Sequence, residues 1–132
     1  MGRHEFEVRT RQRTEIVEIT GAVRAAVSEA GFERGLVHCF VPHTTAALTL
    51  NERNDPQVVA DLANHLEHLV PWAGAWTHQG NAAAHVKASM LGHAVVLTVE
   101  GGELLLGPWQ GLFLCDFHGP RARTVHLLFL PG

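Results

Sequence analysis

The spacing of apolar residues at the start of the chain predicts two strands followed by a helix. Polar and apolar side chains alternate from His4 to Ile19, which is typical of half-buried strands, and the polar run 11–13 marks a turn between them. We expect these two strands to pair as a meander. Apolar residues then recur every three or four positions from Thr20, the expected N-cap, to Gly31, where the helix should stop.

The middle of the chain predicts two buried strands and a longer helix. Residues 35–41 and 46–50 are compact apolar runs, and the polar cluster 43–45 lies between them. Asp55 followed by Pro56 is a typical helix start, because an aspartate caps free backbone N–H groups and proline fits the first turn. Apolar residues with helical spacing follow directly.

The last part of the chain predicts one more helix and several strands. Residues 81–91 are alanine-rich and end at Gly92, as expected of a helix. The apolar runs that we expect to form strands are 94–99, 104–106, 111–117 and 124–130. This order of elements predicts a single α+β domain over residues 1–132, with mainly antiparallel sheets and about three helices.

Composition supports one folded domain and argues against a nucleic-acid partner. The chain has 132 residues, of which 46% are hydrophobic and 17% charged, enough apolar material for one core. Its formal net charge is −3, so it has no overall basic field to hold a nucleic acid.

No stretch approaches the roughly 18 apolar residues of a membrane span, and we expect no secretory segment. Cys39 and Cys115 lie in apolar runs, as buried reduced thiols would, so we expect a cytoplasmic protein.

The ten histidines equal the number of lysines and arginines together, and some of them suggest a ligand site. His78, Asn81 and His85 are spaced i, i+3 and i+7, which places them on one face if the helix starts early enough. Two imidazoles and a third donor, for which His43 is the best candidate, could hold a transition metal. The same residues could equally be polar groups on a solvated helix, and the spacing alone does not decide between the two interpretations.

Two further polar clusters lie at the ends of predicted strands. Thr44 and Thr45 offer hydroxyls that could bind an anion, while Glu52 could act as a general base or bind a cation. The threonines could instead satisfy backbone groups at a bend. Arg121 and Arg123 follow a rigid turn and could clamp a phosphate with two guanidinium groups, or be a pair of surface arginines.

Taken in order, several of these motifs resemble those of the YjbQ family. The segments that carry the resemblance are His43-Thr44-Thr45-Ala46, Asn51-Glu52, Asp55, Asp61, His78, Asn81, His85, Leu106-Gly107-Pro108-Trp109-Gln110 and Gly119-Pro120-Arg121-Ala122-Arg123. Members of this family are also called secondary thiamine-phosphate synthases. Three positions depart from the family pattern: Ala94 stands in place of a serine, Pro108 in place of a threonine and His118 in place of an acidic residue.

The resemblance implies a compact α+β domain that assembles as a homotrimer and acts on small phosphorylated molecules. The implied reaction joins hydroxymethylpyrimidine diphosphate to thiazole phosphate and releases pyrophosphate. The resemblance leaves open which substrate is the physiological one. The implied roles are phosphate binding for Arg121 and Arg123, divalent metal binding or direct phosphate contact for His43, His78 and His85, an acid–base or orienting role for Glu52 and Asp61, and substrate orientation for Asn81. Imidazole ligands favour zinc, whereas diphosphate chemistry favours magnesium.

Two other classes of function would use the same residues. A non-catalytic trimeric module would bind a metal ion or a small phosphorylated ligand, whereas a metal-dependent hydrolase would cleave phosphate esters. The hydrolase would release inorganic phosphate without a thiazole acceptor, and the binding module would hold its ligand without turnover. The sequence is compatible with all three classes.

Overall fold

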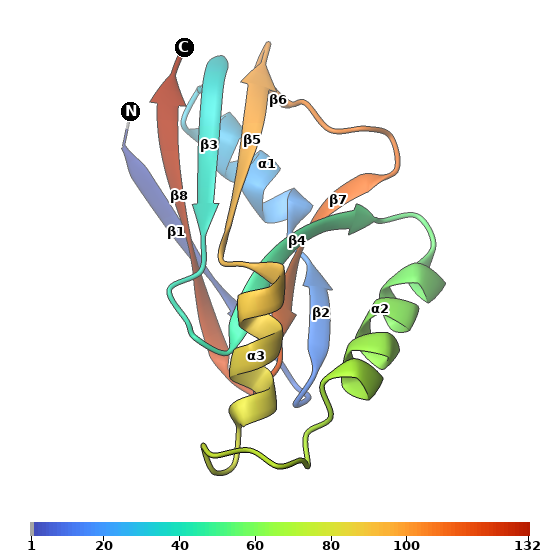
Figure 1. Cartoon of the computed structure of the whole chain (residues 1–132). Coiled ribbons are helices and arrows are strands. Elements are labelled where there is room, and N and C mark those ends of the chain that lie inside the picture. Colours follow the sequence, from blue (N-terminus) through green and yellow to red (C-terminus); the bar gives the residue numbers. More distant parts are fainter. Residues whose placement is uncertain (1) are drawn as a thin grey trace.

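The computed structural model describes residues 2–132, which form two antiparallel sheets and three helices (Figure 1). The elements along this part of the chain are β1 (Arg3–Arg9), β2 (Glu15–Glu18), α1 (Thr20–Glu29), β3 (Arg34–Phe40), β4 (Ala46–Glu52), α2 (Pro56–Leu69), α3 (Ala82–Leu91), β5 (Ala94–Glu100), β6 (Glu103–Leu104), β7 (Gln110–Asp116) and β8 (Ala122–Pro131). The predicted α+β class with antiparallel sheets and three helices is confirmed.

The strands form one sheet of five and one of three. The larger sheet has the order β1-β8-β3-β5-β6, and the smaller has the order β2-β7-β4. The meander predicted for residues 4–19 is wrong, because β1 pairs with β8 while β2 pairs with β7 in the other sheet. Alternation identified both strands, but local sequence carries no information about partners that lie about a hundred residues away.

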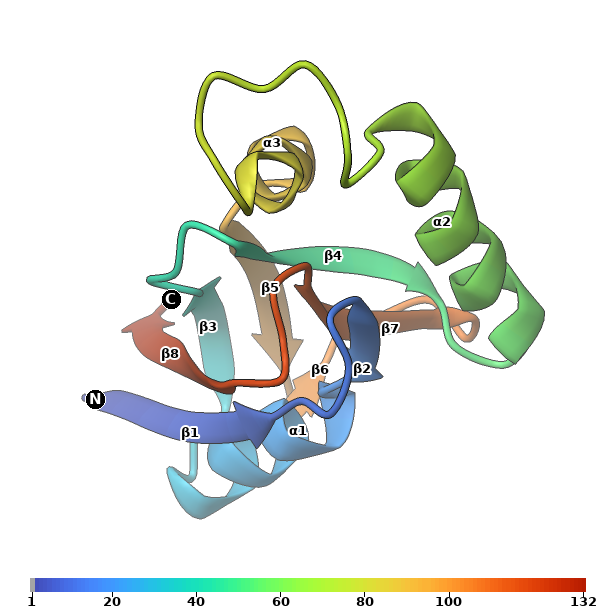
Figure 2. The same cartoon turned by 90° about the horizontal axis from the view of Figure 1, so that it is seen from below.

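The main core fills the space between the two sheets and α1. Val23 and Val27 of α1 pack there with Val37 of β3, Leu48 of β4 and Leu114 of β7. A second cluster covers the other face of the small sheet, where Leu66 of α2 and Ala84 and Ala88 of α3 meet Ala47, Cys115 and Phe117. Figure 2 shows α2 and α3 on this side of β4. The small sheet is therefore buried on both faces, which explains the nearly continuous apolar run of β7.

Of the two N-caps predicted from the sequence, Asp55 is confirmed and Thr20 is wrong. The Asp55 carboxylate accepts a hydrogen bond from the Gln57 backbone N–H at 3.0 Å, as predicted for an N-cap. Thr20 is not an N-cap, because it is the first residue of α1 and follows Ile19 at the cap position. Its hydroxyl accepts from the Leu112 N–H at 2.9 Å, so it joins α1 to β7.

The outer face of the large sheet exposes apolar side chains. Leu36 and Phe40 of β3, Val96 of β5, and Leu128 and Leu130 of β8 are all exposed there. The register places Leu36 opposite Leu130, so the exposed residues form a continuous surface across the two strands. No helix of residues 2–132 is both long enough and apolar enough to cross a membrane.

Lys87 joins α3 to α2 from a buried position. Its side chain is only 1% exposed, and its Nζ donates to Glu67 Oε1 at 2.5 Å. The same ammonium lies 5.8 Å from the centre of the Phe117 ring. Glu67 is partly exposed and also accepts from the Thr14 hydroxyl at 3.0 Å. The carboxylate is therefore the partner that compensates the burial of the Lys87 charge.

Replacement of Glu67 should lower the free energy of unfolding more than replacement of Lys87. Glu67→Ala leaves an ammonium buried without its partner, and we expect a loss of about 2 kcal/mol in the free energy of unfolding. Lys87→Met removes the buried charge and leaves Glu67 with access to water, so we expect a change within about 1 kcal/mol. Urea unfolding followed by circular dichroism measures both. Equal losses in the two variants would contradict the asymmetry.

Candidate functional site

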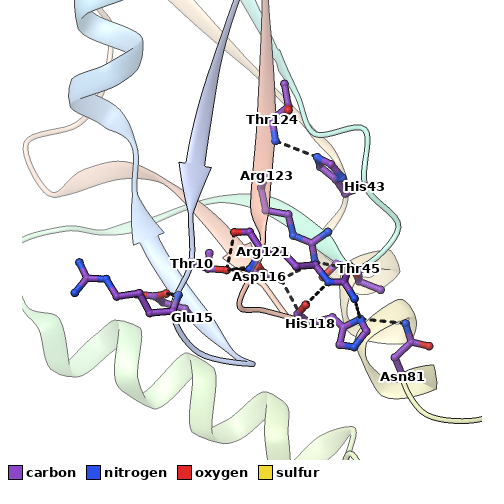
Figure 3. A network of polar contacts seen from close by, with 11 residues as sticks. Thr10, Glu15, His43, Thr45, Asn81, Asp116, His118, Arg121, Arg123 and Thr124 are labelled. Atoms are coloured by element: carbon purple, nitrogen blue, oxygen red, sulfur yellow. Dashed lines mark hydrogen bonds and ion pairs between the residues drawn. The ribbon is translucent and has the colours of Figure 1, made fainter.

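A buried ion pair lies where β7 ends and β8 begins (Figure 3). Arg123 Nη2 donates to Asp116 Oδ1 at 2.6 Å and to the Thr45 hydroxyl at 2.7 Å. The Asp116 and Arg123 side chains are 0% and 5% exposed. The Thr10 hydroxyl donates to the other carboxylate oxygen of Asp116 at 2.6 Å. The pair therefore ties together the ends of β1, β4, β7 and β8.

Asp116 stays ionised because its neighbours outweigh its burial. Burial by itself raises the pKa of the carboxyl group, but hydrogen bonds from Arg123, Thr10 and the His118 backbone N–H lower it further than burial raises it. The positive charge of Arg123 acts in the same direction. The net result is a pKa below the ordinary value of 3.8, so Asp116 is a carboxylate at neutral pH.

The turn between β7 and β8 is held on this buried pair. The His118 N–H donates to Asp116 Oδ1 at 2.9 Å, and the Arg121 N–H donates to the Thr10 hydroxyl at 3.0 Å. Gly119 passes so close to the 10–13 segment that a Cβ atom there would lie 2.2 Å from the Gln12 carbonyl oxygen. Only glycine fits at this position, and the close approach fixes where His118 and Arg121 emerge.

His118 is the centre of the polar groups that reach the surface. Its Nδ1 accepts from Asn81 Nδ2 and from Arg121 Nη2, each at 3.2 Å. Its ring lies 5.7 Å from the ring of Trp72, which in turn has the Arg13 guanidinium at 4.3 Å. Burial and then the charges of Arg121 and Arg123 lower the pKa of His118 below its ordinary value of 6.5. The imidazole is therefore neutral at physiological pH.

His78, Asn81 and His85 meet as the sequence predicted, but by a different route. Helix α3 begins at Ala82, so Asn81 is its N-cap residue and His78 lies in the loop before it. His78 Nε2 donates to Asn81 Oδ1 at 2.8 Å, and the His78 and His85 rings lie edge to face with 5.2 Å between their centres. Asn81 thus connects two histidines through one amide, because its Oδ1 binds His78 and its Nδ2 binds His118.

Two cavities adjoin this row of polar residues. One of about 430 Å³, which we call the Trp76 hollow, is lined by Trp76, Thr77, His78, Ala82, His85 and Val86. The other of about 490 Å³, which we call the Trp72 hollow, is lined by Trp72, Gln79, Gly80, Asn81 and His118. The hydrogen bond between His78 and Asn81 joins the two linings. Each hollow therefore combines one tryptophan with at least one imidazole.

The other candidates from the strand ends have structural partners. His43 Nε2 accepts from the Thr124 backbone N–H at 3.0 Å, and burial followed by the charge of Arg123 lowers the pKa of its ring. Thr45 is buried and accepts from Arg123, whereas Thr44 is exposed. Arg123 is committed to the buried pair, so of the two arginines predicted to bind phosphate, Arg121 is the one that is exposed to a ligand.

The metal ligands expected from the sequence are only partly brought together. His78 and His85 are neighbours, but the third candidate, His43, has its Nε2 bound to a backbone N–H. Within residues 2–132, no three histidine, cysteine, aspartate or glutamate side chains are placed to hold one metal ion. The chain offers two imidazoles at the Trp76 hollow, and a metal there would need further donors from a bound ligand or a second chain.

Glu52 and Asp61 lie away from this cluster within one chain. Thr45 immediately precedes β4 and Glu52 ends it, so a strand of about 20 Å separates them. Glu52 Oε2 accepts from the backbone N–H groups of Asn54 and Asp55, at 2.7 and 2.6 Å, and so holds the start of α2. Asp61 is exposed on α2. Asn81 is the one expected catalytic residue that the fold places in the cluster.

Sequence reasoning missed Asp116, Thr10, Trp72 and the role of His118. A charge at the end of an otherwise apolar run was the available signal for Asp116, because a buried carboxylate requires a buried cation, and an arginine follows seven residues later. Nothing local links Thr10 or Trp72 to this turn, since they reach it from β1 and from the loop before α3.

The fold and this cluster define an α+β domain of two packed antiparallel sheets with a histidine- and arginine-lined site at one end. Its sequence matches the family model of UPF0047 protein YjbQ-like over residues 4–132, and the chain belongs to this family. The UPF0047 protein of Methanocaldococcus jannaschii is 40% identical over 93% of this chain and 90% of its own length. UPF0047 protein YugU of Bacillus subtilis is 39% identical over 92% and 94%.

Solved structures give the same result for the fold. A hypothetical protein from Aeropyrum pernix superimposes with a TM-score of 0.95 at 37% identity over the whole of both chains. A YjbQ/UPF0047 family protein from Clostridium acetobutylicum superimposes with a TM-score of 0.93 at 38% identity, covering 96% of this chain and 99% of its own. The resemblance to the YjbQ family is therefore confirmed, and so is the fold that it implied.

Proposed function

We propose that this protein is a transferase that joins hydroxymethylpyrimidine diphosphate to thiazole phosphate and releases pyrophosphate. The observation that carries the proposal is the pair of adjoining hollows on either side of the His78–Asn81 hydrogen bond. A reaction between two ring-bearing phosphorylated substrates needs two neighbouring subsites, each with an apolar wall for a ring and polar donors for a phosphate. Tryptophan supplies the wall in both hollows, and imidazoles and the Asn81 amide supply donors. Arg121 lies beside the Trp72 hollow, where its guanidinium is bound to His118.

The chemistry of this transfer suits the residues present. The thiazole nitrogen donates its electron pair to the pyrimidine methylene carbon, and the bond from that carbon to the pyrophosphate oxygen breaks and leaves its electrons on pyrophosphate. Neither step requires a proton from a strong acid, so the enzyme has to align the substrates and stabilise the negative charge of the leaving group. Arg121 supplies a fixed positive charge next to His118. His78 and His85 line the Trp76 hollow, and Asn81 lines the Trp72 hollow.

A divalent metal is a second part of the proposal. His78 and His85 would be its protein ligands, and phosphate oxygens or water would complete its coordination, because the Trp76 hollow provides two imidazoles among the described residues. Such a metal would neutralise charge on the departing pyrophosphate. Two imidazoles favour zinc or a similar ion over magnesium, which prefers oxygen ligands.

A homotrimer is the third part of the proposal. The exposed apolar face of the large sheet supports association between copies, since a contiguous apolar surface of Leu36, Phe40, Val96, Leu128 and Leu130 is unfavourable in water. An assembly also offers a role for Glu52 that one chain does not. Its carboxylate lies a strand length from the histidines, so it would reach a site only in the neighbouring copy.

The test is formation of thiamine phosphate from the two precursors by the purified protein. We expect turnover by the wild type, and a loss of about 100-fold or more in kcat/KM for both Arg121→Ala and His85→Ala, because each removes a group that meets developing charge. His65→Ala, on the exposed side of α2, is the matched control and should stay within about threefold. Chelator treatment, followed by metal analysis of the protein, tests the metal separately.

Two outcomes would replace the transferase. Release of inorganic phosphate from a phosphate ester without a thiazole acceptor would assign the same site to a hydrolase. Pyrophosphate or diphosphate binding without any product, in a folded wild type, would assign it to a binding module. Unchanged turnover in Arg121→Ala and His85→Ala would move the chemistry to another part of the molecule.

A further inference from the structure

The two ring nitrogens of His118 have different surroundings. Nδ1 accepts hydrogen bonds from Asn81 Nδ2 and from Arg121 Nη2. A guanidinium group has no acceptor, and the Asn81 amide oxygen is already used by His78, so the amide presents its NH₂ to His118. Nδ1 must therefore carry the lone pair, and the single proton of the neutral ring lies on Nε2. The neighbours of His118 thus fix one tautomer.

The protonated nitrogen is the part of His118 that is free for a ligand. The hydrogen bonds of His118 within residues 2–132 use its Nδ1, its backbone N–H and its carbonyl oxygen. The side chain lines the Trp72 hollow together with Trp72 and Gly80. Arg121 Nε donates to the His118 carbonyl at 2.7 Å, and the tilted Trp72 ring packs near the imidazole, so the ring is held on two sides.

We propose that His118 is a ligand-binding residue that donates its Nε2–H to a phosphate oxygen of the molecule bound in the Trp72 hollow. This inference rests on the proposed function for the identity of the ligand, because it assigns one phosphate group of that substrate to this hollow. It adds a residue that neither the histidine spacing nor the resemblance had placed among the binding groups. In this site His118 acts as a donor, and its neighbours hold it in that state before the ligand arrives.

The charges around the hollow favour an anion over a neutral ligand. Arg121 is exposed beside His118, and the nearby carboxylate of Asp116 is fully buried and neutralised by Arg123. Helix α3 also begins at this point without a side-chain cap, since the Asn81 amide is used by the two histidines. The positive end of α3 adds to the charge of Arg121. An oxygen with negative charge is therefore the acceptor that best fits Nε2–H.

Two substitutions distinguish the roles of the two ring nitrogens of His118. Asparagine places an oxygen near the position of Nδ1, so His118→Asn keeps the acceptor for Asn81 and Arg121 and removes the outward donor. Glutamine places its amide nitrogen near the position of Nε2, so His118→Gln keeps the donor. We expect His118→Asn to raise the dissociation constant of inorganic pyrophosphate by about 10–100-fold, and His118→Gln to raise it by no more than about threefold. His65→Asn on α2 is the control for a histidine away from the hollow.

The experiment is isothermal titration calorimetry with inorganic pyrophosphate at neutral pH, together with ¹⁵N spectra of the imidazoles. The spectra should show His118 in the Nε2–H form, and pyrophosphate should shift its Nε2 signal. Weaker binding by His118→Gln than by His118→Asn would overturn the proposal, because it would assign His118 a purely structural role through Nδ1. Equal weakening by both substitutions would also overturn it, because the Nε2–H donor that only His118→Gln keeps would then make no difference. No binding of pyrophosphate to the wild type would overturn it as well.

Binding and turnover distinguish the two proposals. If His118→Asn weakens pyrophosphate binding and His118→Gln does not, the inference about His118 holds even when no thiamine phosphate is formed. In that case the transferase alone fails. If thiamine phosphate is formed and both variants bind pyrophosphate as the wild type does, the transferase stands and His118 has no part in phosphate binding.

Discussion

Asp116→Ala is expected to lower the free energy of unfolding by about 3–5 kcal/mol, the usual cost of removing one partner from a buried ion pair. The substitution leaves the Arg123 guanidinium buried without a counter-charge, and Arg123 Nε already has no hydrogen-bond partner. It also removes the acceptor of the Thr10 hydroxyl and of the His118 N–H. Urea unfolding of the purified variant measures the loss.

The matched control is an ion pair on the surface. Arg34 and Glu100 lie 3.6 Å apart with both side chains more than half exposed, so Glu100→Ala should cost no more than about 0.5 kcal/mol. Asp116→Asn keeps an oxygen for Thr10 and should fall between the two. It also provides a measurable variant if Asp116→Ala does not fold. A loss below about 1 kcal/mol for Asp116→Ala would mean that the buried pair does not hold the turn.

The same residue gives the stability a defined pH dependence. The pKa of Asp116 is lower in the folded chain than its ordinary value of 3.8, so the folded state binds this proton less readily than the unfolded state. The contribution of Asp116 is therefore complete above about pH 4 and is lost as the pH falls through the folded value. Glu67, whose pKa is also lowered, acts in the same direction. The stability of Asp116→Asn should consequently fall less steeply in acid than that of the wild type.

Local patterns predicted the elements better than their partners. The Asp55-Pro56 start of α2 and the stop of α3 at Gly92 follow from capping and backbone geometry, which involve only neighbouring residues. The pairing of β1 with β8 and of β2 with β7 depends on the collapse of the whole chain, so alternation between residues 4 and 19 could not show it. Thr20 was predicted to be a cap because a threonine commonly precedes a run of helical spacing, but its hydroxyl accepts from the Leu112 N–H of β7 instead.

Only the part of the candidate site that forms from neighbouring residues could be predicted from the sequence. His78, Asn81 and His85 are close in sequence, so their meeting needed only a short loop and the first turn of α3. Arg121 and Arg123 looked equivalent in sequence, yet β8 directs Arg123 inward to Asp116 and leaves Arg121 exposed. Which arginine remains exposed to a ligand depends on a carboxylate five residues before the first of them, and this could be decided only once both strands were placed.

The largest expected change in activity comes from mixing two inactive variants. His85→Ala removes an imidazole from the Trp76 hollow, and Glu52→Gln removes a charge at the far end of β4 while it keeps an oxygen for the backbone of Asn54 and Asp55. Each variant alone should lose about 100-fold or more in kcat/KM, because each would damage every site of a trimer whose sites lie between copies. The wild type should have three times the 14.4 kDa mass of one chain by light scattering.

Co-unfolding and refolding of the two variants in equal amounts should restore activity. A site between neighbouring copies is intact when one copy contributes His85 and the other contributes Glu52, which random assembly gives in about one quarter of sites. Activity near one quarter of the wild type would therefore place the two residues in a shared site. If both belonged to the site of one chain, no mixture would contain an intact site and activity would stay at the level of the variants. Restoration would explain how His85 on α3 and Glu52 at the end of β4, which lie apart within one chain, act in the same reaction. Its absence would leave Glu52 with the role at the start of α2 that its hydrogen bonds already define.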